Sequence, residues 1–537
     1  MPSVSAAADP AALARALEEF FAAWPGAAVF EDGRLLFDLR LAHCSVTAEH
    51  GRCLLHLWSE ERNIVRTVTG ITPRRETLRL ETRRFGQTKA QTLTLMPDPD
   101  CRTPTARDTA RRKYQRGLER ALAAAFPEWK VESFRSAMDL ENSFGPAYAR
   151  GMLVRGQAAW AVLGVGPEEA QATIEGALTL GILWLAHCRE HGNGRRVFHG
   201  LRLVTPRGSA AVAQSRMSWL DRAEAQWELY ELDAGSGELT ACPDANTGNL
   251  AIDLLHAFDP EAALERCAAG VDQLRSMLPP EMLAATEIRP RGATEVWFAL
   301  HGLGYARVRH GLAPGSFARR NEVTFGAGPS ETALDETTED LFLDLMDRLF
   351  RGRCVEGSAR DPLYRLQPER WLESELRRDL SVLDPMLGAA PVYSQVPAFA
   401  SASRTLLDLL TVTRQGRLAV LELKADDDLH LPLQALDYWA RVRQLHREGE
   451  LARQAYFPGV ELASADPLLL LVAPALHIHP ANETVLRHFA PAVPWELIAL
   501  DEHWREQCRV VLRKRGAIRQ VEEKAGHGRI RVPLRQG

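Results

Sequence analysis

The chain has 537 residues, of which 46% are apolar and 25% are charged, a composition typical of a globular protein that folds in water. No segment is apolar for long enough to suggest a membrane span, and the N-terminus lacks the basic and apolar regions of a secretory signal. The eight cysteines are scattered without a Cys-x2-Cys pair, which argues against a zinc ribbon, an iron–sulfur cluster and a disulfide scaffold. We therefore expect a cytoplasmic protein of three or four domains, or of two large ones, with no membrane partner.

Charge is distributed unevenly along the chain, although the net charge is only −5. Residues 61–130 carry an excess of eight positive charges and residues 509–537 an excess of seven, so the remaining residues sum to −20. Segregated positive charge favours binding to phosphate groups. The two basic segments therefore predict a nucleic-acid partner, and the acidic remainder leaves a protein partner open.

Residues 1–140 are predicted to form a β-rich region followed by a basic helix. An alanine-rich helix over 10–24 precedes six short strands between residues 28 and 96, which turn residues separate. Residues 107–120 are then predicted to form a helix with many cationic side chains. Either this helix has a solvated charged face, or it contacts nucleic-acid phosphates through Arg111, Arg112, Lys113 and Arg116.

Residues 145–260 are predicted to form a mixed α/β region. The pattern indicates a strand over 158–163, a long apolar helix over 167–189, and strands over 201–205 and 227–232. The sequence has no phosphate-binding loop and no complete dinucleotide-binding fingerprint. The order of strands and helices is similar to that predicted near the C-terminus but lacks its acid-x-Lys strand, so a degenerate copy of that fold is one interpretation.

Residues 261–350 are predicted to form an α+β region, and residues 351–360 a linker. Helices come first, strands follow up to residue 325, and the last element is an acidic amphipathic helix with Leu341, Leu345 and Leu349 on its apolar side. In one strand the alternation places Tyr305, Arg307 and Arg309 on the same face. That face is either simply exposed or contacts nucleic acid.

Residues 361–512 contain the most informative segment of the chain. Two apolar runs flank a short Arg-Gln-Gly turn, which predicts a β-hairpin. If the strands pair symmetrically about Gln415, Asp408 lies opposite Glu422, and Lys424 points to the same face. A slip of one residue would move Asp408 to the opposite face.

Three charged side chains on an otherwise apolar hairpin require an explanation. Opposed carboxylates repel each other and are costly to bury, and a divalent cation between them would remove both costs. The alternative is a cluster of salt bridges at the end of a sheet. The next predicted helix carries Gln434 and Tyr438 four residues apart, so both project from one of its faces.

These residues together resemble the PD-(D/E)XK nuclease superfamily, which has the restriction-endonuclease-like fold. Within it, the nuclease domain of the NucS/EndoMS endonucleases is the most similar. The resemblance rests on Asp408, on Glu422-Leu423-Lys424 and on the pair Gln434 and Tyr438. It covers about residues 361–512 and leaves residues 1–360 without a recognised family.

Upstream, Pro368 opens a predicted helix at its first position. By resemblance this is the first helix of the nuclease fold, whose acidic residue would be Glu369, with Glu373 one turn later as the alternative. The sequence departs from the family pattern at Leu407, which stands where the strict motif has proline. This departure is common in the superfamily.

The resemblance implies an α/β multidomain protein whose C-terminal domain has a mixed sheet flanked by helices. It implies a nuclease that uses Mg²⁺ or Mn²⁺ to cut phosphodiester bonds within DNA, leaving 5′-phosphate and 3′-hydroxyl ends. Two alternatives stay open: a catalytically idle nuclease fold that binds DNA or serves in assembly, and a nuclease directed at RNA. A homodimer also stays open, and residues 513–537 are expected to form a loosely ordered basic tail.

The roles that the resemblance implies fall on seven residues. The metal ligands would be Asp408, Glu422 and the backbone carbonyl of Leu423. Lys424 would orient or deprotonate the attacking water, and Glu369 would complete the acidic shell or hold a second ion. The scissile phosphate would be positioned by Gln434 and Tyr438.

Overall fold

The computed structural model divides the chain into two compact units. Unit 1 comprises residues up to 210 together with 228–242, and unit 2 comprises 211–227 together with the residues from 243 onward. The structure describes residues 9–24, 26–31, 34–39, 42–49, 51–58, 63–74, 77–84, 90–97, 104–139, 143–192, 196–244, 253–254, 256–312, 318–328, 331–387, 391–400 and 403–516. Beyond residue 516, the predicted loosely ordered tail lies outside these ranges.

The first sheet of unit 1 is antiparallel and seven-stranded, with strand order β2-β1-β7-β6-β5-β4-β3. Its elements are α1 (Pro10–Ala23), β1 (Ala28–Glu31), β2 (Arg34–Asp38), β3 (His43–Glu49), β4 (Arg52–Trp58), β5 (Asn63–Arg74), β6 (Thr77–Arg84) and β7 (Ala90–Met96). Asp9 caps α1 by accepting a hydrogen bond from the Ala11 N–H, and Pro10 occupies the first turn. The apolar side of α1 buries Leu17 and Phe20 in the core of the sheet. Only β3 was absent from the sequence-based prediction.

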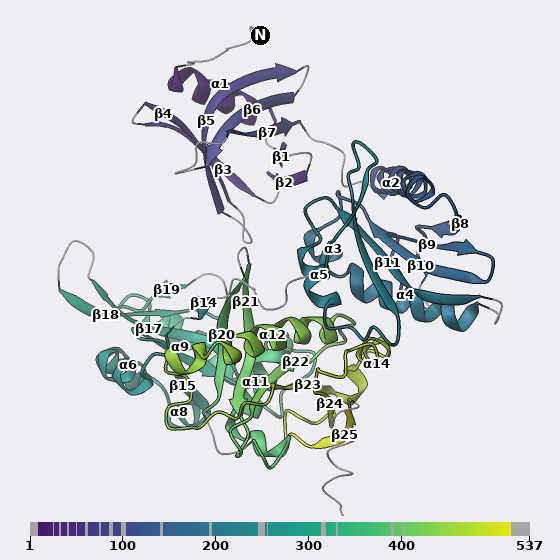
Figure 1. Ribbon diagram of the computed structural model, residues 1–537. Helices are drawn as coiled ribbons and strands as arrows, with labels where there is room; N and C mark the ends of the chain where they lie inside the picture. The colour runs from purple at the N-terminus through teal and green to yellow at the C-terminus, as the bar shows by residue number, and fades with distance from the viewer. Residues whose placement is uncertain are drawn as a thin grey trace, which may run out of the picture. The chain divides into compact units, whose positions relative to one another are not determined.

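The second sheet of unit 1 has six strands in the order β13-β12-β11-β10-β9-β8. Its elements are α2 (Pro104–Ala125), β8 (Lys130–Arg135), β9 (Tyr148–Arg155), β10 (Ala158–Val165), α3 (Gln171–Glu175), α4 (Ala177–His191), β11 (Val197–Pro206), β12 (Gln226–Leu232) and β13 (Leu239–Ala241). The helices α2 and α4 lie on opposite faces of this sheet (Figure 1). The basic helix α2 therefore packs here through Leu118 and Leu122, and is not part of the β-rich region with which the sequence analysis grouped it.

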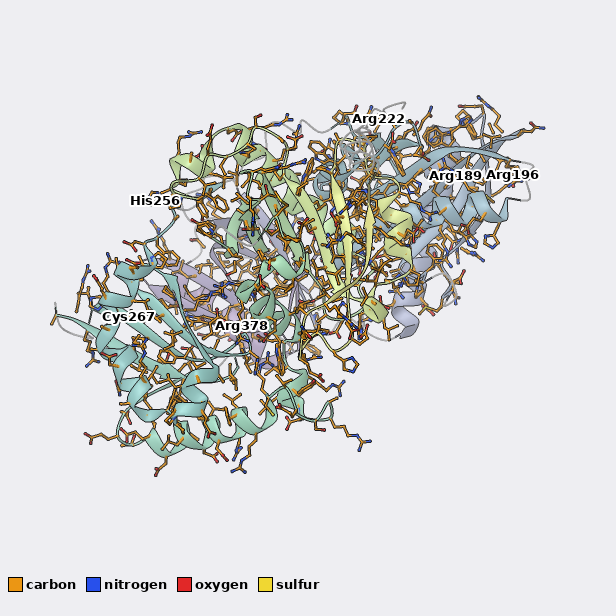
Figure 2. All side chains as sticks on the ribbon, turned by 90° about the horizontal axis from the view of Figure 1, so that it is seen from below. Arg189, Arg196, Arg222, His256, Cys267 and Arg378 are labelled. Carbon is orange, nitrogen blue, oxygen red and sulfur yellow. The ribbon has the colours of Figure 1, made fainter. Side chains whose placement is uncertain are left out.

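The third sheet lies in unit 2 and is an antiparallel meander in the order β15-β16-β17-β18-β19. Its elements are α6 (Pro260–Arg266), α7 (Ala268–Met277), α8 (Pro280–Ala285), β15 (Thr286–Gly292), β16 (Glu295–Leu300), β17 (Leu303–Leu312), β18 (Arg319–Phe325), β19 (Thr332–Ala333) and α9 (Glu339–Gly352). Its core includes Cys267, which Figure 2 labels, and the cysteines in the described ranges are all free thiols.

Two sequence-based predictions for the third sheet are wrong. Phe298 pairs with Ala306 and Ala299 with Gly304, so Tyr305 is the extra residue of a β-bulge. The bulge breaks the alternation and turns Tyr305 into the core, where it is 1% exposed. In α9 the prediction fails only at Leu341, which is 55% exposed. Leu349 is buried and Leu345 is partly buried against the same core, and Phe342 and Met346 complete the buried side of the helix.

The C-terminal sheet is mixed, with strand order β14-β20-β21-β22-β23-β24-β25. Its elements are β14 (Asp253–Leu254), α10 (Pro362–Arg365), α11 (Pro368–Arg378), η1 (Leu380–Val382), β20 (Tyr393–Ala400), β21 (Ser403–Val412), β22 (Leu418–Leu423), α12 (Leu431–Arg447), α13 (Glu450–Arg453), β23 (Leu468–Pro474), η2 (Ala475–His477), α14 (Ala481–Leu486), β24 (Trp495–Leu500) and β25 (Val510–Arg515). The strands β22, β23 and β24 run parallel, and the other pairs are antiparallel. The predicted mixed sheet flanked by helices is therefore present.

The segment 351–360, predicted as a linker, is tied to the protein through a buried arginine. Arg353 is fully buried, and its guanidinium donates hydrogen bonds to the carbonyls of Leu300 at 3.0 Å, His301 at 2.7 Å and Leu363 at 3.0 Å. The start of this segment therefore joins the third sheet to the C-terminal domain within unit 2. In the described part of the chain, no helix has the length and apolar character needed to cross a membrane.

Candidate active site

The hairpin of β21 and β22 brings the predicted charged residues together. Leu409 pairs with Leu421 and Val412 with Leu418, so the next step along the same register places Asp408 across from Glu422. The Asp408 Oδ2 atom accepts a hydrogen bond of 2.9 Å from the backbone N–H of Leu423. The register predicted from the sequence is therefore confirmed.

The turn of this hairpin depends on Gly416. Its φ of +76° lies in the left-handed region, and a side chain there would collide with the Glu461 carbonyl. The glycine therefore holds the register that brings Asp408 opposite Glu422.

The two facing carboxyl groups lie in apolar surroundings. Glu422 is 3% exposed, and its Oε2 atom is buried without a hydrogen-bond partner among the described residues. Burial raises the pKa of Asp408 to about 6. Burial and then the negative charge of Asp408 raise the pKa of Glu422 well above its usual value. In the absence of a cation, the pair therefore retains a proton near neutral pH.

Lys424 lies among three carboxylates. Its Nζ atom is 3.6 Å from Glu369, 3.7 Å from Asp428 and 3.9 Å from Glu422. Burial alone would lower the pKa of Lys424, but the surrounding carboxylates outweigh burial and raise it, so the ammonium stays charged. Asp428 was not predicted, although the acidic run that ends at this residue, just after Lys424, was a signal for it.

The structure distinguishes the two acidic residues of α11. Glu373 is 3% exposed and pairs with Arg289 at 3.3 Å and with Arg370 at 2.7 Å, so its charge is neutralised by two guanidinium groups. The Glu369 carboxylate lies at Lys424, and its side chain is 46% exposed. Glu369 is therefore the acid of this helix that faces both the cluster and solvent.

The helix α12 brings Tyr438 towards the acidic pair. Burial raises the pKa of the Tyr438 hydroxyl, and the charges of Glu422 and Asp408 raise it further, so the phenol stays protonated. Gln434 lies one turn earlier on the same helix and is half-buried. A protonated phenol and an amide can both donate hydrogen bonds to a phosphate oxygen.

The donor set fits a hard divalent cation. No group of three or more His, Cys, Asp or Glu side chains arranged to hold a metal occurs in the described part of the chain. The site offers the carboxylates of Asp408 and Glu422, with the carbonyl of Leu423 as the predicted third ligand. Mg²⁺ and Mn²⁺ favour oxygen ligands, and Mg²⁺ keeps several waters, so few protein ligands suffice. The unpartnered Glu422 Oε2 atom and the two facing carboxyl groups, of which Glu422 is buried and Asp408 half-buried, fit such a cation.

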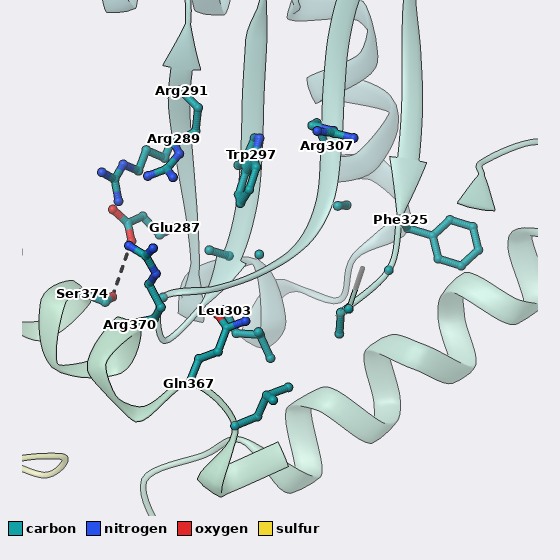
Figure 3. A pocket seen from close by; sticks show the side chains of 18 of the residues that line it. Glu287, Arg289, Arg291, Trp297, Leu303, Arg307, Phe325, Gln367, Arg370 and Ser374 are labelled. Atoms are coloured by element: carbon teal, nitrogen blue, oxygen red, sulfur yellow. Dashed lines mark hydrogen bonds between the residues drawn. The ribbon is translucent and has the colours of Figure 1, made fainter. Parts of the chain in front are cut away.

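A pocket of about 570 Å³ opens beside the first turn of α11. Arg289, Arg291 and Arg370 gather on one side of it, with Trp297 beside them (Figure 3). The Arg291 guanidinium carbon lies 4.9 Å from the centre of the Trp297 ring, and burial followed by the charge of Arg289 lowers the Arg291 pKa to about 10. Guanidinium groups beside an indole are suited to an anionic group or an aromatic base.

The predicted nucleic-acid contacts on α2 differ from one another. Arg111 makes a bidentate ion pair with Glu169, at 2.7 and 3.1 Å, which uses its guanidinium. Arg112, Lys113 and Arg116 are exposed on the same helix.

The second basic segment begins inside the C-terminal sheet. Arg513 of β25 pairs with Glu496, and Lys514 pairs with Glu483. These two cations therefore form ion pairs within the C-terminal domain.

The comparisons with known proteins find no relative. No protein-family model matches the chain, and no significant match is found to a curated protein or to a solved structure. The interpretation of the site therefore rests on its own residues and geometry, together with the resemblance of its motif.

Proposed function

We propose that the protein is a metal-dependent nuclease that hydrolyses phosphodiester bonds within DNA. The observation that carries this proposal is the convergence of Asp408, Glu422 and Lys424 on one face of a buried hairpin, with an unpartnered carboxylate oxygen. Two buried carboxyl groups that face each other destabilise a fold, so they need a compensating function. Binding a divalent cation and a phosphate supplies one, and the resemblance to PD-(D/E)XK nucleases points to the same chemistry.

In this proposal Asp408, Glu422 and the Leu423 carbonyl hold Mg²⁺ or Mn²⁺. The bound cation would stabilise negative charge on the phosphate and lower the pKa of a water. Lys424 would donate a hydrogen bond from its ammonium to that water or to a phosphate oxygen. Glu369 would add negative charge from the exposed side of the site. Gln434 and Tyr438 hold the phosphate in place through their hydrogen-bond donors.

The reaction would form a bond between the oxygen of water and phosphorus and break the bond between phosphorus and the 3′ oxygen. The 3′ oxygen leaves with a proton as a hydroxyl, and the phosphate stays on the 5′ side. Affinity for the phosphate backbone would come from the exposed cations of α2, Arg112, Lys113 and Arg116, and from Arg291 in the pocket beside α11, where Arg289 and Arg370 are already paired with Glu373.

A substrate panel tests the proposal. Circular duplex DNA, circular single-stranded DNA, linear duplex with a mismatch, and RNA are incubated with the protein and Mg²⁺ or Mn²⁺, with EDTA as the control. We expect cleavage of a circular DNA, which has no ends, and loss of cleavage in EDTA and in the variants Asp408→Asn and Glu422→Gln.

Binding is measured in parallel, because the alternatives predict different results. Both variants are expected to bind DNA as the unaltered protein does. Binding without any cleavage would establish the idle nuclease fold, and cleavage of RNA alone would replace DNA with RNA as the substrate. Cleavage that persists in EDTA would exclude the assigned site.

A further inference from the structure

The second sheet and the C-terminal sheet have the same topology. In both, six successive strands are neighbours in chain order: β8 to β13 and β20 to β25. In both, the first three strands form antiparallel pairs, the third and fourth run parallel, and the last pair is antiparallel. A long helix precedes each set, α2 or α11, and another joins the third strand to the fourth, α4 or α12.

Short sequence matches support this likeness. Leu201-Arg-Leu-Val-Thr-Pro206 in β11 matches Leu469-Leu-Leu-Val-Ala-Pro474 in β23 at four of six positions. Trp227-Glu-Leu-Tyr-Glu-Leu-Asp233 in β12 matches Trp495-Glu-Leu-Ile-Ala-Leu-Asp501 in β24 at five of seven. Both matches have the same spacing of 268 residues, which identifies the fourth and fifth strands of one sheet with those of the other.

Strand pairing extends the equivalence to the candidate active site. Glu422 pairs with Leu471, whose equivalent at this spacing is Leu203. Leu203 pairs with Leu163, and Leu163 lies across from Arg150 on the preceding strand, just as Glu422 lies across from Asp408. Leu163 therefore stands for Glu422, Arg150 for Asp408 and, two residues further on, Val165 for Lys424.

The side chains at these positions in the second sheet are apolar or of opposite charge to those of the candidate active site. Leu163 and Val165 are fully buried apolar side chains, so neither can hold a metal or a water. Arg150 is fully buried as well, donates a hydrogen bond of 2.8 Å to the Ala137 carbonyl, and has its guanidinium carbon 4.8 Å from the centre of the Phe144 ring. A fixed cation thus replaces a metal ligand, and it would repel a divalent ion.

The segments that lead into the fifth strands pair with each other inside unit 2. Leu220 lies three residues after α5 (Ala211–Met217) and six before β12, and Phe489 has the same spacing from α14 and β24. Leu220 and Phe489 form a β-bridge, Asp221 N–H donates to the His488 carbonyl, and Ala490 N–H donates to that of Trp219, both at 2.8 Å. Segments that hold equivalent places in the two folds thus pair with each other within unit 2.

We propose that residues 104–241 are a second, catalytically inactive copy of the C-terminal fold, so that one chain holds one metal centre and cuts one strand of a duplex per binding event. This inference rests on the proposed nuclease function. Cutting both antiparallel strands in one event requires two centres related by a two-fold axis. Here the counterpart of the centre carries Arg150, Leu163 and Val165 in place of its acids and lysine.

Metal stoichiometry tests the inactive copy without relying on cleavage. Mn²⁺ is titrated into the full chain and followed by calorimetry and by the electron paramagnetic resonance signal of free Mn²⁺. We expect one bound ion per chain, lost in Asp408→Asn and kept in Glu356→Gln, which changes an exposed carboxylate elsewhere. A bound ion that survives Asp408→Asn would overturn the inference, because it would lie outside the C-terminal site.

Strand cutting is tested on a supercoiled plasmid carrying the substrate that the panel identifies. We expect open circles to accumulate first and linear DNA to follow by a second, independent cut, with an initial rate proportional to protein concentration. Linear DNA formed without open circles, or a rate that rises with the square of protein concentration, would overturn single-strand cutting. Neither result would overturn the inactive copy. Absence of cleavage with one Mn²⁺ bound would overturn the proposed nuclease function, and single-strand cutting with it, but not the inactive copy.

Discussion

The second sheet and the C-terminal sheet show how little of a function resides in a fold. Their strand order and helix positions agree, yet one hairpin holds Asp408, Glu422 and Lys424 while the matching hairpin holds Arg150, Leu163 and Val165. Three side chains change the site from one that would bind a cation to one that would repel it. The difference also concerns stability, since buried acids weaken a fold that apolar side chains would strengthen.

The largest effect on function is expected at Lys424, whose counterpart in the second sheet is apolar. Lys424→Met keeps the apolar stem and removes the ammonium, and we expect single-turnover cleavage to fall by about 10²–10⁴-fold, because the group would act on the attacking water. DNA affinity and the thermal unfolding midpoint are measured on the same samples and should change little. Lys130→Met, at an exposed lysine of β8, is the matched control and should cleave normally. Unchanged cleavage in Lys424→Met would reduce Lys424 to an ion-pair partner.

Placing an acid in the second sheet, at the position equivalent to Glu422, tests how much stability a buried carboxyl group costs. Leu163→Glu buries a carboxyl group. Arg150 across the strand has two nitrogen atoms without a hydrogen-bond partner among the described residues, but an ion pair with them offsets only part of the cost of removing the carboxylate from water. We expect the free energy of unfolding to fall by about 2–4 kcal/mol at pH 8. Urea unfolding followed by tryptophan fluorescence measures the loss.

The control for this transplant is Leu163→Met, which changes shape alone and should cost less than about 1.5 kcal/mol. If Leu163→Glu lowers the free energy of unfolding no more than Leu163→Met does, Arg150 forms a full ion pair with the new carboxylate. The second sheet can then hold a buried acid.

Removing an acid from the C-terminal hairpin should raise the free energy of unfolding, whereas Leu163→Glu should lower it. The pKa of Asp408 is raised by burial to about 6, so between pH 4 and 6 the folded protein binds more protons than the unfolded chain, and stability falls as pH rises. Asp408→Asn should therefore stabilise the metal-free protein by on the order of 2 kcal/mol at pH 8, with little gain at pH 4.

The matched control for this pH effect is Asp335→Asn. Hydrogen bonds from Thr337 lower the pKa of Asp335, so its substitution should weaken the protein at pH 6 and 8, and this loss disappears only as pH falls below the usual aspartate pKa of 3.8. Thermal unfolding scans at pH 4, 6 and 8 distinguish the two signs. A loss of stability in Asp408→Asn at pH 8 would contradict the burial argument for the acidic pair.

The smallest expected effect concerns the basic helix α2. Replacing Arg112, Lys113 and Arg116 by alanine should weaken binding equally for all DNA sequences. The slope of log K against log[salt] should become shallower by about 0.9 for each phosphate that the helix no longer neutralises. Fluorescence anisotropy at several salt concentrations measures this slope.

Arg348 and Arg351 provide the control substitutions for α2, because they are exposed on α9 and paired with Asp344 and Asp347. Their replacement should leave the salt slope unchanged. Equal slopes in the control and in the α2 variant would mean that α2 presents only a solvated charged face.

The hairpin was predictable from the sequence because its register follows from local rules. A short turn and a side-chain period of two residues place Asp408 opposite Glu422 without any knowledge of the rest of the chain. Pro368 at the start of a helix is local in the same way. Local patterns failed where long-range packing decides, as at Tyr305, which a β-bulge turns inward.

Other features depended on partners far away in the sequence. Glu373 pairs with Arg289, 84 residues earlier, so the choice between Glu373 and Glu369 needed the structure. The pocket beside α11 combines residues of the third sheet with those of a later helix for the same reason. The equivalence of the two sheets was open to sequence inspection through the predicted order of strands and helices and through the short matches at Leu201 and Trp227, but not through the hairpins themselves, which share no charged residue at the site.

The two hairpins both have short turns, and these turns bear on how the chain folds. Arg155 pairs with Ala158 across a two-residue turn, whereas Thr413 bonds to Arg417 across a turn that is one residue longer. Chains that contain two related domains are prone to exchange equivalent strands before either domain is complete. Each turn joins a strand to its own partner in one register, and a slip of one residue would turn the apolar side chains to the wrong face. Local pairing across these two short turns therefore competes with strand exchange during synthesis.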